Sequence, residues 1–571
     1  MEKLWLKSYP SGVPAEIKLD EYGSLAEVIE RSCFQFMRRP AFENMGSTLS
    51  YGELEELSRA FAGFLSGELG LRKGDRLAIM LPNVLQYPVV LFGALRAGLT
   101  VVNCNPLYTP RELEHQLRDA GAVAIVVLEN FAHTLEQVIG KTELKFVVTT
   151  QLGDLFAWPK AQLINAALKY VKRAVPRWRI NDTFTLKQAL RRGRTRSHLS
   201  VILRPEDIAF LQYTGGTTGV AKGVVLTHRN LIANIQQLSA WIAHDLLPGK
   251  ETIVVPLPLY HIYALTLSLM FTKLGARCVL ITNPRDVPSF IRTLKRVKPT
   301  ALMGVNTLYR TLLDAPGFSG LDFGRLKVSS AGGMAVQRVV AERWKKATGV
   351  PLVEGYGLSE TSPVVISNRL DIDDWNGRIG LPLPSTEVAI LDDAGKPVAN
   401  ETVGEICVRG PQVMKEYWRR PDETQKVFTT DGWFRTGDMG MMDARGYVNI
   451  TDRKKDMIIV SGFKVFPNEI EDVVSMHPDV LEVGAIGVPD SQSGECVKIV
   501  VVKRSAALTE QALLEHCRKH LTGYKVPKLV QFRTEPLPKS AIGKILRRQL
   551  RTEIEKPPVT DTPKPILQAQ G

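Results

Sequence analysis

Apolar runs alternate with helical patterns over the first four hundred residues. Val/Ile-rich runs followed by helices are typical of parallel sheets that are covered by helices on both faces. The runs expected as strands are 76–83, 122–130, 206–213, 251–260, 276–282 and 325–333, and helical patterns at 87–97 and 131–140 follow the first two. The pattern predicts an α/β fold with a large N-terminal domain of parallel sheets covered by helices.

The pattern changes after Gly380, where short strands are separated by turns. This pattern of short strands and turns predicts a small barrel-like or antiparallel subdomain over 381–452, which completes an N-terminal domain of residues 1–452. A charged cluster at 453–455 then separates two strand patterns. A small α+β domain is expected over 456–555, and the proline-rich end, 556–571, is expected to be a disordered tail.

Composition and cysteine spacing narrow the class of protein. A chain of 571 residues with 44% hydrophobic and 23% charged residues is expected to form two to four globular domains. The six cysteines never occur in paired or metal-ligand spacing, which indicates a reducing compartment without disulfides or a zinc site. The N-terminus has no signal-peptide core, and the apolar stretch 263–271 is too short to cross a bilayer. We expect a cytoplasmic protein, with peripheral contact at the inner face of the cytoplasmic membrane left open.

The net charge of +14 is concentrated in one segment. Residues 151–200 hold eleven Lys/Arg, among them Arg191, Arg192, Arg194 and Arg196, and only two acids. Apolar residues at 164, 167, 168, 171, 175 and 178 fall near one helical face, and Pro176 is expected to end the regular run. Two interpretations stay open: a basic amphipathic segment on a membrane surface, or a solvated helix that covers the protein's own core. Nucleic-acid binding ranks below both, so no nucleic-acid partner is expected.

The stretch YTGGTTGVAKG at 213–223 joins two strand patterns. Glycines can aim successive N–H groups into one concavity, threonine hydroxyls add donors and a lysine adds charge, which together suit phosphate oxygens. Ala221 before Lys222 and Gly223 after it exclude a P-loop of the Walker type. A flexible linker is the alternative, but this composition favours phosphate binding. The residues expected to bind ATP phosphates are Tyr213, Thr214, Gly215, Gly216, Thr217, Thr218, Gly219 and Lys222.

This loop resembles the phosphate loop of the acyl- and aryl-adenylate-forming superfamily, which includes acyl-CoA synthetases, luciferases and adenylation domains. Further motifs of that superfamily follow in order at 256–265, 330–334, 354–361, 404–418, 431–438, 452–471 and 538–548. Among its branches, the chain is similar to bacterial long-chain fatty acid–CoA ligases. The resemblance implies activation of a fatty acid by ATP as an acyl-adenylate and transfer to coenzyme A, with release of pyrophosphate and AMP.

The resemblance also implies roles for residues of the nucleotide site. Glu360 is expected to coordinate Mg²⁺, and Ser359 to bind the α-phosphate. Asp438 would accept hydrogen bonds from the ribose hydroxyls, with Arg453 assisting. The expected adenine slot, in which Tyr356 stacks on the base, consists of Gly332, Gly333, Gly355, Tyr356 and Gly357.

In similar enzymes two further residues act on the acid. The resemblance implies that His261 lies where the carboxylate enters the acyl pocket, with a purely structural histidine as the alternative, and that Lys544 of the C-terminal domain assists adenylation. The stretch after Pro256 has no acid to pair a substrate ammonium, so an uncharged tail is favoured. The C-terminal domain is expected to rotate about Lys455 between the two steps, which brings the expected coenzyme A residues to the site: Ser461, Gly462 and Lys464.

Two alternatives and one open question remain. The same fold could activate another acid, such as a medium-chain or aryl acid. A non-catalytic, membrane-associated fatty-acid-binding protein is the alternative from another class, and the presence of Glu360, Asp438, Arg453 and Lys544 disfavours it. The oligomeric state stays open, with a homodimer among the alternatives.

Overall fold

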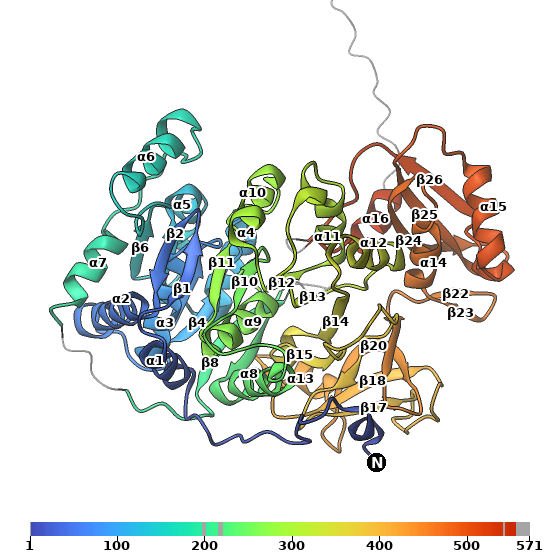
Figure 1. The fold of residues 1–571 in the computed structure, drawn as a ribbon, viewed down its shortest axis with the longest axis horizontal. Coiled ribbons are helices and arrows are strands. Elements are labelled where there is room, and N and C mark those ends of the chain that lie inside the picture. The colour runs from blue at the N-terminus through green and yellow to red at the C-terminus, as the bar shows by residue number, and fades with distance from the viewer. Residues whose placement is uncertain (1, 197–200, 215–220, 541–542, 556–571) are drawn as a thin grey trace, which may run out of the picture. The chain divides into compact units, whose positions relative to one another are not determined.

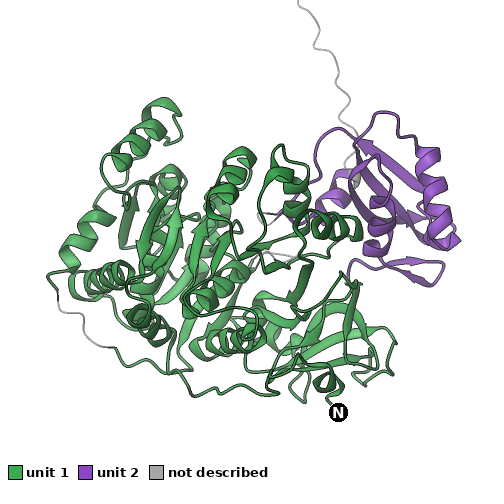
Figure 2. Cartoon of the chain, viewed as in Figure 1, with its two compact units in different colours: residues 1–454 green, residues 455–571 purple. Residues whose placement is uncertain are grey.

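The computed structural model describes residues 2–196, 201–214, 221–540 and 543–555. The chain divides into two units, Met1–Lys454 and Lys455–Gly571 (Figure 2). The division falls within the segment 453–455 that the sequence analysis expects as a hinge, and motion about that segment stays a prediction. No helix in the described part of the chain combines the length and apolar character needed to cross a membrane.

Eight strands of unit 1 form the sheet that leads into the glycine-rich loop. Six neighbouring strands, β8 to β7, pair in parallel, and β9 and β19 add an antiparallel edge; β4, β6 and β8 are labelled in Figure 1. The spatial order is β19 (Glu416–Tyr417), β9 (Lys222–Thr227), β8 (Ile208–Thr214), β4 (Thr100–Asn103), β3 (Arg76–Met80), β5 (Ala124–Leu128), β6 (Phe146–Thr150) and β7 (Thr183–Thr185).

Nine further strands form the second large sheet of unit 1. Its six central strands, β14 to β1, are parallel, and antiparallel strands flank them on both sides. The order is β16 (Leu381–Pro382), β15 (Val364–Ser367), β14 (Leu352–Gly357), β13 (Val328–Ala331), β12 (Ala301–Gly304), β10 (Thr252–Val255), β11 (Arg277–Leu280), β1 (Pro40–Asn44) and β2 (Ser47–Ser50). The strands expected from apolar runs are therefore present in the two sheets.

Helices cover both sheets. The helices of unit 1 are α1 (Leu25–Gln35), α2 (Tyr51–Gly63), α3 (Gln86–Arg96), α4 (Pro110–Ala120), α5 (Ala132–Glu136), α6 (Lys160–Ala166), α7 (Leu186–Gly193), α8 (His228–Ile242), α9 (Ile262–Lys273), α10 (Val287–Val297), α11 (Asn306–Leu313), α12 (Arg338–Thr348) and α13 (Pro421–Val427). Every residue of α3 is buried.

The main core is shared by the two sheets. Leu77 and Ile79 of β3 belong to the same apolar cluster as Ile253 and Val255 of β10. The alternate residues of these strands, such as Met80 and Val254, face outer clusters that α4 and α10–α12 cover. Successive side chains of a strand point to opposite faces, so strands buried on both sides must be apolar throughout.

The last part of unit 1 is a four-stranded antiparallel sheet, as the short strands after Gly380 predict. Its strands are β17 (Glu387–Leu391), β18 (Gly404–Arg409), β20 (Phe434–Met442) and β21 (Val448–Arg453). The register of β20 and β21 pairs Asp438 with Arg453. This sheet thus brings together two residues that the sequence analysis assigns to the nucleotide.

Unit 2 is the α+β domain that the sequence predicts. Its sheet consists of β22 (Ile458–Val460), β23 (Phe463–Val465), β24 (Val480–Asp490), β25 (Gly494–Lys503) and β26 (Leu529–Arg533). Its helices are α14 (Pro467–Ser475), α15 (Glu510–His520) and α16 (Arg547–Glu555). The six cysteines of the two units are all buried and free, in agreement with the absence of paired spacing.

His228 fixes the start of one helix against another. It is the first residue of α8, is 2% exposed, and its Nδ1 accepts a hydrogen bond from the backbone N–H of Leu25 at 3.1 Å. Burial lowers the pKa of His228 to about 4, although the charge of Asp207 acts in the opposite direction. The imidazole is therefore neutral when the protein is folded at neutral pH.

This lowered pKa predicts a loss of stability in acid. Because the unfolded chain binds the proton near pH 6.5, the contribution of His228 is complete above that pH and is lost as the pH falls towards 4. The loss amounts to about 3 kcal/mol at the acid end. In urea unfolding between pH 7.5 and 4.5, His228→Asn should have a shallower pH dependence than the wild type. Equal slopes would contradict the assignment.

Candidate active site

The glycine-rich loop joins two paired strands. Strand β8 ends at Thr214, which pairs with Lys222 at the start of β9. Gly215, Gly216, Thr217, Thr218 and Gly219 lie outside the described residues. The structure therefore describes the two ends of the expected phosphate loop, and the role of the loop stays a prediction.

Tyr213, beside the loop, is anchored through its hydroxyl. The hydroxyl donates to Asp119 Oδ2 at 2.6 Å, and burial raises the pKa of Tyr213 well above its usual value. Asp119 also forms an ion pair with Arg420 at 3.2 Å, and its carbonyl accepts from the indole of Trp418 at 3.0 Å. These contacts fasten the segment 416–420 to the strand that leads into the loop.

Lys222, at the other end of the loop, faces two residues of the segment 416–427. Its ammonium forms an ion pair with Glu423 of α13 and lies 5.2 Å from the ring centroid of Tyr417. The hydroxyl of Tyr417 donates to Glu360 Oε1 at 2.8 Å. Lys222 and Glu360, far apart in sequence, are thus linked through a single aromatic side chain.

Glu360 follows directly on strand β14. It lies in a 3₁₀ turn (Ser359–Thr361), and its carbonyl accepts from the N–H of Met414 at 2.6 Å. Desolvation raises the pKa of Glu360, whereas the hydrogen bond from Tyr417 lowers it. Smaller effects come from Arg453, which lowers the pKa, and Asp438, which raises it.

The environment of Glu360 fits a bound cation. A carboxylate with a desolvation-raised pKa gains stability when a positive charge binds next to it. Oxygen ligands of this kind are the ones that Mg²⁺ prefers in proteins. In the described residues no group of three or more acidic, His or Cys side chains could hold a metal alone. An ion held by Glu360 would therefore need further ligands from substrate phosphates or water.

Tyr356, Asp438 and Arg453 form one contact group, and three different strands supply them. The Tyr356 hydroxyl donates to Asp438 Oδ2 at 2.7 Å, and Arg453 Nε lies 3.4 Å from Asp438 Oδ1. Tyr356 and Asp438 are buried. The structure thus brings together the residues that are expected to bind the base and the ribose.

Glycine is required at one position of the expected adenine slot. A Cβ at Gly357 would lie 1.8 Å from the carbonyl oxygen of Pro363, and one at Gly332 would lie 3.0 Å from the ring of Tyr263. Gly355 has ordinary contacts, with the nearest atom 3.8 Å from such a Cβ. Gly333 has a φ of +76°, which favours glycine. Close packing thus accounts for Gly357, while Gly332 lies against Tyr263.

His261 is the N-cap of α9. Its Nδ1 accepts from the N–H of Tyr263 at 3.3 Å, so the proton of the neutral ring is on Nε2. Desolvation lowers the pKa of His261 to about 4. At neutral pH the residue can therefore donate a hydrogen bond from Nε2 without carrying a charge.

The remaining expected residues lie in unit 2. Ser461 and Gly462 form the tip of the β22–β23 hairpin, with φ values of +50° and +84°, and Lys464 on β23 is exposed. Lys544 is held in a turn, where its N–H donates to Ser540 Oγ at 3.2 Å and its carbonyl accepts from the Ser540 N–H at 2.8 Å.

Arg547, within the motif at 538–548, is largely enclosed by other residues of unit 2. Its side chain is only 13% exposed, and it pairs with Glu471 at 2.7 Å and with Asp456 at 3.7 Å. A buried guanidinium requires such partners. Arg547 therefore fastens α16 to the rest of unit 2.

Sequence reasoning missed Tyr417 and Glu423. Tyr417 lies within the motif at 404–418, but nothing in the sequence shows that its hydroxyl reaches Glu360. Glu423 lies in an ordinary charged stretch, and only the antiparallel pairing of β19 with β9 carries that stretch to Lys222. These contacts depend on tertiary structure and have no local sequence signal.

Comparisons with known proteins match both units of the chain. The family model described as AMP-binding enzyme matches residues 29–418, and the model of the AMP-binding enzyme C-terminal domain matches residues 469–544. A long-chain-fatty-acid–CoA ligase of Escherichia coli O157:H7 is 56% identical over 97% of this chain and 98% of its own.

Two solved structures are similar over most of the chain. The anthranilate CoA ligase AuaEII in complex with anthranoyl-AMP has a TM-score of 0.83 at 25% identity, covering 94% of this chain and 99% of that one. ATP-bound MatB from Rhodopseudomonas palustris has a TM-score of 0.78 at 28% identity, covering 93% and 99%.

Loss of the hydrogen bond from Tyr417 to Glu360 should lower the free energy of unfolding. Tyr417→Phe removes the donor to a desolvated carboxylate but keeps the ring next to Lys222, so we expect the free energy of unfolding to fall by about 1–3 kcal/mol. Urea unfolding at pH 7.5 measures the change. Tyr108→Phe is the matched control, because the Tyr108 hydroxyl forms no hydrogen bond with the described residues. Equal losses in both variants would contradict a special role for Tyr417.

Proposed function

The chain belongs to the AMP-binding enzyme family, and from this we propose that it is an ATP-dependent long-chain fatty acid–CoA ligase. The observation that carries the proposal is the 56% identity to the Escherichia coli ligase over nearly the whole of both chains. The substrates are a fatty acid, ATP and coenzyme A, with Mg²⁺ as the accompanying ion. The products are acyl-CoA, AMP and pyrophosphate.

The reaction needs two steps because a carboxylate is ionised at neutral pH and its oxygen is a poor leaving group. In the first step a carboxylate oxygen attacks the α-phosphorus of ATP, and the bond to the β-phosphate oxygen breaks, which releases pyrophosphate. In the second step the coenzyme A sulfur attacks the acyl carbon. The bond to the phosphate oxygen then breaks, AMP leaves, and the thiol proton passes to solvent.

The contacts among Tyr356, Asp438 and Arg453 support a nucleotide site in unit 1. Asp438 and Arg453 would bind the ribose, Tyr356 would lie against the base, and Ser359 would meet the α-phosphate. Lys222, at the base of the loop, would exchange its partner Glu423 for phosphate oxygens, which is a local change at a partly exposed pair. Bound to Glu360, Mg²⁺ would offset the negative charge of the phosphates.

The surroundings of His261 support an acid with an uncharged tail. The neutral imidazole can donate to a carboxylate oxygen, and the residues that follow it form the largely apolar helix α9. A small apolar cavity lies next to this helix and is lined by Leu259 and by residues of α3, α9 and β1, among them Phe42, Tyr87, Phe92, Leu265 and Leu269. A charged substrate tail would lose its hydration there without a partner.

The residues of unit 2 keep the roles that the resemblance implies. Lys544 would assist adenylation, Ser461, Gly462 and Lys464 would meet coenzyme A, and unit 2 would turn about Lys455 between the steps. The left-handed tip at Ser461 and Gly462 leaves the backbone open for close approach: a Cβ at Gly462 would meet nothing within 4 Å. We further propose peripheral contact of the protein with membrane lipid, while a homodimer has no specific support among the described contacts.

An activity profile across acids tests the proposed function. The purified protein is given ATP, Mg²⁺ and coenzyme A with acetate, octanoate, oleate or benzoate, and AMP and acyl-CoA are quantified. We expect kcat/KM to be highest for oleate, by about tenfold or more over octanoate, because each buried methylene adds about 0.8 kcal/mol of binding. Preference for benzoate would instead identify an aryl-CoA ligase, and AMP formation with no acid would reject the proposal.

Lys544 should act in adenylate formation and not in the transfer of the acyl group to coenzyme A. Lys544→Ala removes a cation that meets charge developing at the phosphate, so we expect adenylate formation to fall by about 10²–10³. Conversion of preformed oleoyl-adenylate with coenzyme A should change by less than about threefold. Rapid-quench measurements of each half-reaction provide the two rates.

Arg548→Ala is the matched control, because it removes a neighbouring cation of the same motif. It should leave both half-reactions within about twofold of the wild type. If Lys544→Ala slowed the two half-reactions equally, rotation about Lys455 would lose its support.

A further inference from the structure

Residues 157–182, here called the basic segment, contain a helix that packs on unit 1 with only one face. Helix α6 continues without interruption into a π-helical turn, η5 (Ala167–Val171), and Figure 1 shows α6 at the periphery of unit 1. On the inner face Ala161 is buried, and Ile164 packs against the main core. This face agrees with the interpretation of a helix that covers the protein's own core.

The helix ends at Val171, earlier than the end at Pro176 that the sequence pattern predicts. Arg173 has a φ of +48°, the Lys172 N–H donates to the Ala167 carbonyl at 2.8 Å, and the Ala174 N–H donates to the Leu168 carbonyl at 2.9 Å. A left-handed residue next to such bonds terminates a helix. Val175 and Trp178 are therefore not part of the helical face expected from the sequence.

The outer face of the basic segment is apolar and exposed, and of its four apolar residues only Val171 belongs to the helical face expected from the sequence. Trp158 is 80% exposed, Leu163 66%, Tyr170 72% and Val171 80%. Leu163 and Tyr170 are seven residues apart and so lie on one side of the helix. Single exposed apolar residues are ordinary, but four within fourteen residues mark an interaction surface.

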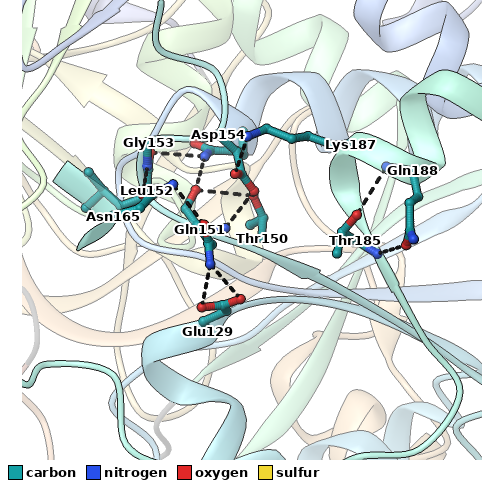
Figure 3. Close-up of polar contacts among 11 residues, drawn as sticks. Glu129, Thr150, Gln151, Leu152, Gly153, Asp154, Asn165, Thr185, Lys187 and Gln188 are labelled. Atoms are coloured by element: carbon teal, nitrogen blue, oxygen red, sulfur yellow. Dashed lines mark hydrogen bonds and ion pairs between the residues drawn. The ribbon is translucent and has the colours of Figure 1, made fainter. Parts of the chain in front are cut away.

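A polar network prevents the helix from turning this face inwards (Figure 3). Asn165 Oδ1 accepts from the Gly153 N–H at 2.8 Å, and Asn165 Nδ2 donates to Gln151 Oε1 at 2.9 Å. Gln151 in turn donates to Glu129 at 3.0 Å. Asp154 accepts from the Gln151 N–H at 2.8 Å and pairs with Lys187 of α7 at 3.0 Å. The inner side of α6 is thus fixed, and Leu163 and Tyr170 face away from it.

The cations of the region fall into two classes. Arg192 and Arg196 pair with Glu68 at 3.0 and 2.6 Å, and Arg194 pairs with Glu56 at 2.8 Å. Most of the arginine cluster that dominates the charge of the sequence is therefore neutralised locally. In contrast, no cation of the basic segment has an ion pair with any described residue: Lys160 donates a hydrogen bond to the Met45 carbonyl, and the other five are Lys169, Lys172, Arg173, Arg177 and Arg179. Asp182 is the only acid among residues 157–182.

We propose that the basic segment docks on the surface of an anionic phospholipid bilayer. The exposed side chains of Trp158, Leu163, Tyr170 and Val171 enter the headgroup region, and the five unpaired cations contact lipid phosphates. Aromatic and aliphatic groups beside unneutralised cations suit this interface, since a bilayer offers apolar depth and negative charge together. The choice of a bilayer rests on the proposed function in one respect, because long-chain fatty acids partition into membranes.

Co-sedimentation with vesicles tests the surface. The full chain is mixed with phosphatidylglycerol-containing vesicles and with pure phosphatidylcholine vesicles, and the partition coefficient is measured. An apolar variant, Leu163→Ser/Tyr170→Ser/Val171→Ser, and a cation variant, Lys169→Gln/Lys172→Gln/Arg177→Gln, should each bind anionic vesicles at least about tenfold more weakly. Wild-type binding should fall at least about tenfold on pure phosphatidylcholine.

The paired arginines offer a control with the same change in net charge. Arg192→Gln/Arg194→Gln/Arg196→Gln should weaken binding by less than about twofold, because these cations are already neutralised by acids. Equal weakening by the control and the cation variant would mean that only net charge matters and would overturn the proposal. Unchanged binding of the apolar variant, or no binding of the wild type, would overturn it as well.

Activity in the same preparations keeps this proposal separate from the proposed function. AMP formation from detergent-dispersed oleate should be within about twofold in all four proteins, since no substituted residue belongs to the catalytic site. A wild type that binds vesicles but forms no AMP would reject the ligase and leave the docking surface intact. If a variant with weakened vesicle binding also lost AMP formation, misfolding would explain its weak binding. That variant would then no longer support the docking surface.

Discussion

The desolvation of one carboxylate is the constraint on which the site depends. Desolvation raises the pKa of Glu360, although Tyr417 donates a hydrogen bond to it and Arg453 acts favourably. Such a group is stabilised most by a cation bound next to it. Under the proposed function a metal–nucleotide complex would supply that cation and would also bring phosphate oxygens to Lys222. Substrate binding would thereby offset the cost of desolvating the carboxylate.

The two large sheets bring this group together from distant parts of the chain. Strand β14 leads directly into the turn that carries Glu360, and β9 begins at Lys222. The short strand β19 pairs with β9 and places Tyr417 between them. The four-stranded sheet then adds Asp438 and Arg453 in register. Paired strands therefore supply Lys222, Tyr417, Asp438 and Arg453 from four separate parts of the chain.

The fold was predictable where periodicity is strong, and the site only where a motif is local. The buried strands and the α+β character of unit 2 follow from apolar runs, since strands covered on both faces must be continuous in Val and Ile. Asp438 and Arg453 could be named from motifs, but the contact of Tyr417 with Glu360 depends on a two-residue strand that no pattern reveals. The exposed face of α6 was missed for a related reason. Which of two apolar stripes packs inwards is decided by Asn165 and its partners, not by hydrophobicity.

Fatty-acid-dependent exchange of label between pyrophosphate and ATP tests the central claim most directly. The protein is incubated with ATP, Mg²⁺, labelled pyrophosphate and oleate, and coenzyme A is omitted. Reversible attack of the carboxylate on the α-phosphorus predicts label in ATP only when oleate is present. It also predicts a loss of about a hundredfold or more in Glu360→Gln, which removes the charge that would hold Mg²⁺. Exchange without oleate, or equal exchange in the variant, would contradict the account.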